Sequence, residues 1–316
     1  MKKRMFSVPY NGAPADEYIS ATTPYMEHID SVFFGLPSLL DTHPRYKNEE
    51  ESEKNTLEFL SKPIPCKRYL TLNKAHYQMS DHDMRMLCSG KVFPLIDEYH
   101  IEGVIVTDYN AAKFIHQNRP CVEISTSCNS FLYNIRAMRL WQENCGATIF
   151  NPPRDILRSP KLLKEMHDAG FKLKCIVNES CRYGCPQQMT HCFSAGRTAG
   201  TFFYECSKMG ETGILKCNWV LPRWLKQLDE YVDVYKIAGR GATLERIASM
   251  LDAYINERDD IHLDDFLYGA VYRGEHCNLP TNMIPDKLLA CGCMDCGKGC
   301  NLCSVTVAKW HGKGNP

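Results

Sequence analysis

Short apolar runs recur along the whole chain, and each is followed by a segment that can form a helix. They lie at residues 5–9, 31–35, 69–73, 103–108, 121–125, 147–150, 172–178 and 232–237. The intervening segments 79–99, 129–143 and 159–169, and a segment from Thr243 onward, are predicted helices. Eight strand–helix units predict a (β/α)8 TIM-like barrel. A doubly wound open sheet would show the same alternation, so the strand count distinguishes the two folds.

Length and charge narrow the function classes. The chain has 316 residues, with 37 Lys plus Arg and 37 Asp plus Glu. This balance favours neither a nucleic-acid surface nor a membrane surface. The N-terminus lacks an apolar signal region, and no stretch of about 18 apolar residues occurs. We therefore expect a soluble cytoplasmic protein, with a barrel over residues 1–270 and a cysteine-rich C-terminal extension over residues 271–316.

Seventeen cysteines are unusual for a chain of this kind. Their number is odd, and the chain is too long to depend on disulfides as small secreted domains do. Reduced thiols that bind metals are the expected use of these residues. Cys175 is an exception, since it falls within a predicted strand and should behave as a small apolar side chain.

One cysteine group follows the seventh predicted strand, in CIVNESCRYGCPQQMTHC (residues 175–192). Four thiolates bind either a tetrahedral zinc or an iron–sulfur cluster. The paired Cys-x2-Cys knuckles of zinc ribbons are absent, and this spacing favours a cluster. The predicted ligands are Cys181, Cys185, Cys192 and Cys217, with Cys206 or an earlier thiol as alternatives for the fourth position.

A second group closes the chain in ACGCMDCGKGC. It continues to Cys303 with the spacing Cys-x2-Cys-x3-Cys-x2-Cys, through Cys293, Cys296, Cys300 and Cys303. Glycines between these cysteines permit tight turns around a metal. The compact spacing favours a second cluster, and a structural zinc site is the alternative.

Polar residues that follow the last strands are candidates for catalysis, because the loops at the carboxyl ends of barrel strands converge at one mouth. Glu179 and His191 are candidates for proton transfer, and Lys236 and Arg240 for binding an anionic substrate. Each has a structural alternative. Glu179 would form a surface ion pair with Arg182, His191 would cap a helix or bind the metal, and Lys236 would lie against a barrel carboxylate such as Glu123.

Three segments resemble peptidase family U32 in order and spacing. They are VEISTSCNSFLYNIRAMRLWQENCGATIFNPPRDI (residues 122–156), CIVNESCRYGCP (175–186) and VDVYKIAGR (232–240), and the similarity extends over about residues 100–258. Asn178, Cys181, Cys185, Pro186 and His191, together with Cys217 and the cysteine-rich tail, are most similar to a cysteine-rich subgroup. The loop itself departs from the better-known members, since Asn-Glu-Ser-Cys-Arg-Tyr-Gly-Cys replaces their Ser-Gly-x-Cys element.

The resemblance implies a TIM-type barrel with a 4Fe-4S cluster and oxygen-independent hydroxylation of quinone precursors or RNA bases. We therefore expect an iron–sulfur oxidoreductase or hydroxylase that acts on a small anionic or aromatic substrate. Its partners would be an electron-donor protein or a related U32-like subunit. The alternative is a non-catalytic, metal-stabilised barrel that binds RNA or protein. Peptidase activity is not expected, because no Ser-His-Asp, Cys-His or His-Glu-x-x-His arrangement occurs.

Overall fold

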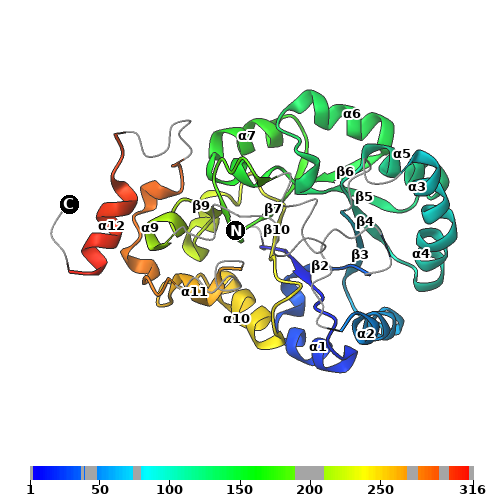
Figure 1. The fold of residues 1–316 in the computed structure, drawn as a ribbon, viewed down its shortest axis with the longest axis horizontal. Coiled ribbons are helices and arrows are strands. Elements are labelled where there is room, and N and C mark those ends of the chain that lie inside the picture. Colours follow the sequence, from blue (N-terminus) through cyan, green and yellow to red (C-terminus); the bar gives the residue numbers. More distant parts are fainter. Residues whose placement is uncertain are drawn as a thin grey trace.

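Eight parallel strands form a closed barrel, drawn at the centre of Figure 1. The computed structural model describes residues 3–36, 39, 48–73, 80–188, 210–268, 277–291 and 299–312. The barrel strands are β1 (Phe6–Pro9), β2 (Ile29–Phe34), β3 (Lys67–Leu72), β4 (Gly103–Val106), β5 (Glu123–Thr126), β6 (Ala147–Phe150), β7 (Lys172–Ile176) and β10 (Val234–Lys236). Each predicted strand overlaps one of them, so the barrel is confirmed and the open sheet is wrong.

Helices surround the barrel and cover the outward faces of its strands (Figure 1). They are α1 (Ala15–Thr22), α2 (Glu49–Ser61), α3 (Asp81–Leu87), α4 (Phe93–Tyr99), α5 (Tyr109–Asn118), α6 (Ile135–Cys145), α7 (Pro160–Asp168) and α10 (Leu244–Ile255). Polar side chains cap several of them: Asn48, Ser80, Asp108, Asn134 and Thr243 each accept a hydrogen bond from a backbone N–H in the first turn. These hydrogen bonds fix where the helices begin.

Two predicted helices differ in detail from the observed ones. The segment 79–99 consists of α3 and α4 joined by a π-helical stretch, Cys88–Val92. The segment 129–143 becomes helical only at Ile135, because Asn134 caps α6 there and a separate 3-10 turn, Cys128–Ser130, follows β5. The loop between β5 and α6 is therefore longer than predicted and lies at the carboxyl end of the barrel.

A two-stranded antiparallel sheet is added at the same end of the barrel. It pairs β8 (Asn178–Arg182) with β9 (Cys217–Trp219). The sequence predicted a single strand over residues 172–178 followed by a loop, but β7 ends at Ile176 and part of the cysteine segment is itself a strand. This β8–β9 sheet also contacts the segment after α11, because the backbone N–H of Ser180 donates a hydrogen bond to the carbonyl of Tyr268 (3.0 Å).

Shorter helices lie beside the barrel, toward the left of Figure 1. They are α9 (Gly210–Ile214), α11 (Leu263–Phe266) and α12 (Leu302–Trp310). His311, just after α12, lies 2.6 Å from a carboxylate oxygen of Glu211 in α9. The boundary at residue 270 stays a prediction.

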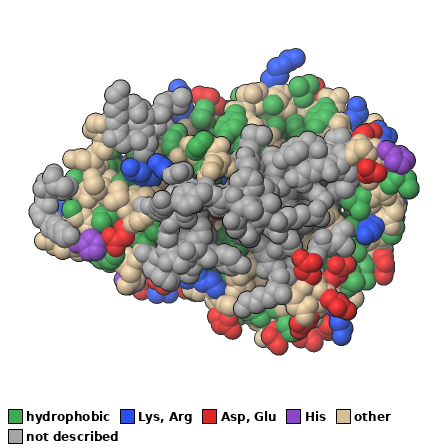
Figure 2. Space-filling view, in the orientation of Figure 1, with side chains coloured by type: hydrophobic (Ala, Val, Ile, Leu, Met, Phe, Trp, Pro, Cys, Tyr) green, Lys and Arg blue, Asp and Glu red, His purple; other side chains and the backbone are tan. Residues whose placement is uncertain are grey.

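The charge distribution follows the helices. Acidic side chains gather over α1 and α2 in Figure 2, and the first turns of these helices carry Asp16, Glu17 and Glu49–51. Negative charge in a first turn is favourable because it faces the positive end of the helix dipole. In the part of the chain that the structure describes, no helix combines the length and the apolarity needed to cross a bilayer.

Candidate functional site

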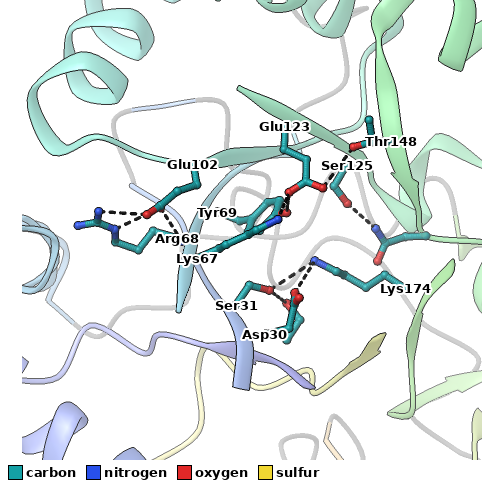
Figure 3. Close-up of polar contacts among 12 residues, drawn as sticks. Asp30, Ser31, Lys67, Arg68, Tyr69, Glu102, Glu123, Ser125, Thr148 and Lys174 are labelled. Carbon is teal, nitrogen blue, oxygen red and sulfur yellow. Dashed lines mark hydrogen bonds and ion pairs between the residues drawn. The ribbon is translucent and has the colours of Figure 1, made fainter. Parts of the chain in front are cut away.

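The amino-terminal half of the barrel interior contains a buried lysine (Figure 3). The Lys174 side chain has no exposed surface, and its Nζ lies 3.4 Å from Ser31 Oγ and 3.9 Å from Asp30 Oδ2. The ammonium also stands 4.2 Å from the centre of the Tyr69 ring. Burial lowers the pKa of Lys174 to about 8, while the nearby Asp30 opposes this shift.

Glu123 belongs to this lower layer, the amino-terminal half of the barrel, and not to the mouth at the carboxyl ends of the strands. It accepts a hydrogen bond from Lys67 Nζ (2.7 Å) and another from the Tyr69 hydroxyl. Lys236, which the sequence offered as a partner of Glu123, lies at the opposite end of its strand. The alternative in which Lys236 pairs with Glu123 is therefore wrong in the structure, where Lys67 is the ion-pair partner.

Lys236 lies at the carboxyl end of β10, where the barrel opens. The residue is 7% exposed, and its Nζ stands 4.1 Å from the centre of the Phe33 ring. Burial lowers the pKa of Lys236 to about 7; Cys128 and Glu179 oppose the shift, and the positive charges of Lys174 and Arg240 add to it. The amine is therefore poised near neutrality, as expected of a group that exchanges protons.

Arg240 is the second cation at the mouth. It follows β10, is 8% exposed, and donates through Nη1 to Thr71 Oγ1 on β3 (3.0 Å). A guanidinium held across the barrel in this way offers a planar set of donors to a carboxylate or phosphate. The predicted residues Lys236, Arg240 and Glu179 thus lie in one neighbourhood, and His191 lies outside the described residues.

Glu179 does not pair with Arg182, and that alternative is wrong. Its carboxylate forms an ion pair with Arg154, which also donates from Nη1 to Asn129 Oδ1 (2.9 Å). The Arg154 side chain is almost fully buried, so the pair is shielded from water. It joins the loop after β5, the loop after β6 and β8 into one wall of the mouth.

Sequence reasoning missed Cys128, Asn129 and Arg154. The signal available for Arg154 was its position just after the sixth strand, in Asn-Pro-Pro-Arg. Beside it, Asn151 donates to Ser125 Oγ (3.0 Å) and to the Thr126 carbonyl, and its own Oδ1 has no hydrogen-bond partner among the described residues. Polar groups from β5, β6 and β8 therefore meet where the barrel strands end.

The described thiols do not form a cluster site. Cys217 is fully buried and donates to the Gly213 carbonyl (3.5 Å), and between β8 and β9 its register partner is Arg182. Over the described ranges, no three His, Cys, Asp or Glu side chains are arranged to hold a metal.

Several other predicted ligands lie outside the described part of the chain. Cys192, Cys206, Cys293 and Cys296 lie outside the described residues, so the four-thiol sets remain predictions. Cys300 is exposed and Cys303 is buried on α12. Cys175 is buried in β7, and burial raises the pKa of its thiol, as predicted for an apolar role.

Comparison with known proteins gives two informative matches, while no family model matches the chain. The "Uncharacterized protease MJ1657" of Methanocaldococcus jannaschii is 26% identical over 226 residues, which cover 67% of this chain and 65% of the relative. The solved structure of the U32 peptidase Mk0906 superposes with a TM-score of 0.53 at 12% identity, over 76% of this chain and 94% of that one. The resemblance to the U32 family is confirmed. The structural match at this identity supports the barrel fold.

These findings correct the function expected from the sequence. The sequence predicted an iron–sulfur redox or hydroxylation enzyme, with a metal-stabilised binding barrel as the alternative. Peptidase activity was not expected. The relatives are named as a protease and a peptidase, and the described thiols fit no cluster. The redox prediction is therefore wrong, and the peptidase class returns to consideration for the U32-like chain.

Proposed function

We propose that the chain is a hydrolase that cleaves an amide bond in an anionic substrate, with its centre at the barrel mouth. The observation that carries this proposal is Lys236, a buried amine at the carboxyl end of β10 with a pKa of about 7. Active sites of this fold lie at the carboxyl ends of the strands. A lysine with an ordinary pKa would be fully protonated near neutral pH and unable to accept a proton.

The chemistry assigns a separate role to each cation. Unprotonated Lys236 accepts the proton of the attacking nucleophile and then donates it to the nitrogen of the amine that leaves, which is the task of a general base with a pKa near the working pH. Arg240 holds a carboxylate of the substrate or the oxyanion that forms at the cleaved carbonyl. The Arg154–Glu179 pair holds the loop after β6 against β8 and so keeps the wall of the mouth in place.

Peptides are the proposed substrates because the sequence relative is named a protease. The match covers 65% of that relative. A peptide supplies both features that the mouth requires, an amide bond and a terminal carboxylate. The nucleophile is either water or the thiol of Cys128, which opposes the lowering of the Lys236 pKa.

Lys236→Met tests the proposal. A defined library of short peptides with free C-termini is incubated with the full chain, and product is quantified by mass spectrometry. We expect kcat/KM to fall by at least about 100-fold, the usual contribution of a general base. The wild-type rate should rise with pH through an apparent pKa near 7, because only the neutral amine accepts the proton.

Lys172→Met is the matched control, since Lys172 is an exposed lysine on β7. Its rate should equal that of the wild type. Full activity in Lys236→Met, or no hydrolysis of any library member by the wild type, would refute the proposed function. Cys128→Ser then separates the two nucleophiles, because activity is retained if water attacks.

A further inference from the structure

The loop between β5 and α6 is held rigidly at the mouth. Ser130 Oγ lies 3.2 Å from the Val106 carbonyl and 3.1 Å from the Thr107 carbonyl, at the end of β4. Asn129 is 4% exposed and accepts a hydrogen bond from Arg154. The segment 128–130 is thus fixed to β4 on one side and to the Arg154–Glu179 pair on the other.

Phe131 follows this turn in a backbone conformation that is unfavourable for a residue with a side chain. Its φ is 52° and its ψ is 43°, which is the left-handed region. A residue with a Cβ loses roughly 1–2 kcal/mol in that region, whereas glycine adopts it freely and asparagine with less difficulty. The position nevertheless carries a large, partly exposed ring. Backbone strain of this kind gathers at ligand-binding sites.

Tyr133 places a second ring beside the first. The two ring centres are 6.5 Å apart and the planes differ by 22°, while Tyr133 is 47% exposed. Burial raises the pKa of Tyr133, and Asp155 adds to this shift while Arg154 opposes it, which places the ring close to both. The aromatic pair therefore borders the wall of the mouth that Arg154 and Glu179 form.

We propose that Phe131 and Tyr133 form a subsite for an aromatic group of the substrate. The inference rests on the proposed function and makes its substrate class narrower: peptides and N-acyl amino acids that carry an aromatic group near a carboxylate. The carboxylate binds Arg240, the amide lies near Lys236, and the aromatic group lies against the two rings. Contacts between aromatic rings contribute about 0.5–1.5 kcal/mol beyond area burial, which is enough to select a substrate but not to bind it alone.

Binding of two related probes tests the subsite without turnover. N-benzoylglycine and N-acetylglycine share an amide and a carboxylate, and only the first has an aromatic ring. Dissociation constants are measured by NMR titration of the full chain. We expect N-benzoylglycine to bind roughly 2- to 10-fold more tightly, which is the factor that corresponds to an aromatic contact.

Phe131→Gly separates a binding role from a structural one. Glycine relieves the left-handed strain, so the melting temperature should stay the same or rise while the preference for N-benzoylglycine disappears. Tyr133→Ala provides a second variant at an exposed position and should reduce the preference as well. Leu140→Ala is the control, because Leu140 is an exposed apolar residue on α6 and should not affect either probe.

The outcomes distinguish this inference from the proposed function. Equal affinities of the wild type for the two probes, or a full preference in both Phe131→Gly and Tyr133→Ala, would overturn the subsite. A preference that disappears in both variants supports it. If the subsite is supported but Lys236→Met hydrolyses the peptide library at the wild-type rate, the catalytic proposal fails and the aromatic subsite remains.

Discussion

Two buried lysines lie on neighbouring strands of the barrel and differ in their surroundings. Lys174 pairs in register with Val234 and Lys236 with Ile176, so the two lysines share the inward face and are offset by two residues. Lys174 has Asp30 beside it, whereas Lys236 has the cation Arg240. The positive charge of Lys174 also lowers the pKa of Lys236, so a residue of the lower layer affects the protonation of the amine at the mouth.

The pKa of Lys236 makes the stability of the protein depend on pH. The pKa falls from 10.5 to about 7 on folding, so between these values the unfolded chain binds a proton that the folded chain does not. Stability therefore rises with pH through this window, and below about pH 7 the full cost of burying the charge is present. Lys236→Met removes that cost.

We expect Lys236→Met to be more stable than the wild type at pH 6, by an amount on the order of a few kcal/mol. The difference should shrink as the pH rises toward 10. Urea unfolding at pH 6, 7.5 and 9 measures it, with Lys172→Met run in parallel because its lysine is exposed and acts only through its charge near Lys174, so its pH-dependent difference should be much smaller. A constant difference at all three values would show that the folded-state pKa of Lys236 is not lowered.

At the scale of elements, the β8–β9 sheet is attached to the barrel through Asn178. The side-chain oxygen of Asn178 accepts from the Ala238 N–H (2.7 Å), and its nitrogen donates to the Ala238 carbonyl (3.0 Å). One amide side chain thereby satisfies both polar groups of a loop residue, as a neighbouring strand would. Because Arg240 follows two residues later, this contact also helps to position the cation of the mouth.

Asn178→Ala should lower the free energy of unfolding by about 2–3 kcal/mol, since it leaves both partly buried backbone groups of Ala238 without their protein partner. It should also weaken binding of N-acetylglycine, because Arg240 loses support. Urea denaturation and the NMR titration measure the two effects. Asn144→Ala, at an exposed position on α6, is the control and should stay within about 0.5 kcal/mol of the wild type. Equal stabilities of the two variants would contradict the role of Asn178.

The strands could be predicted from sequence because their apolar runs are short and bounded by polar residues. Gly103–Val106 is buried along its whole length, which is typical of a parallel strand covered on both faces. The segment Asn178–Arg182 gave no such signal, since it is polar and becomes a strand only by pairing with Cys217–Trp219. That partner is distant in sequence, and local patterns do not encode such a pairing.

The site could also be predicted only in part, because local sequence indicates residues near strand ends but not their contacts with distant segments. Lys236 ends the last barrel strand and Arg240 follows it after a short loop, so position alone indicated them. Arg154 acts through a partner 25 residues away, and Phe131 is notable for a positive φ, which a bulky aromatic residue does not announce in sequence. Thiol spacing predicted metal binding, and this stays a prediction because Cys192, Cys206, Cys293 and Cys296 lie outside the described residues.

At the scale of the whole molecule, the barrel closes only when the first and last strands meet. β1 pairs with β10, and the backbone N–H of Ile237 donates to the Ser7 carbonyl (2.9 Å). Arg4, just before β1, binds Asp229 through two nitrogens at 2.7 and 2.8 Å and also pairs with Glu257. Because these residues lie more than 220 positions apart, the contacts form only in the closed barrel.

Arg4→Met tests how far closure of the barrel depends on this ion-pair group. The Arg4 side chain is 13% exposed, so its loss leaves Asp229 partly buried beside Tyr235 without its cation. We expect a loss of about 2–3 kcal/mol in the free energy of unfolding, below the 3–5 kcal/mol of a fully buried pair. Lys3→Met is the neighbouring control: its pair with Glu27 is exposed, so removing it should cost less than about 1 kcal/mol. Urea unfolding followed by tryptophan fluorescence and by far-UV circular dichroism should give one coincident transition for each variant if closure and folding are a single event. Separate transitions in Arg4→Met would instead show that the barrel opens at the β1–β10 seam before the remaining strands unfold.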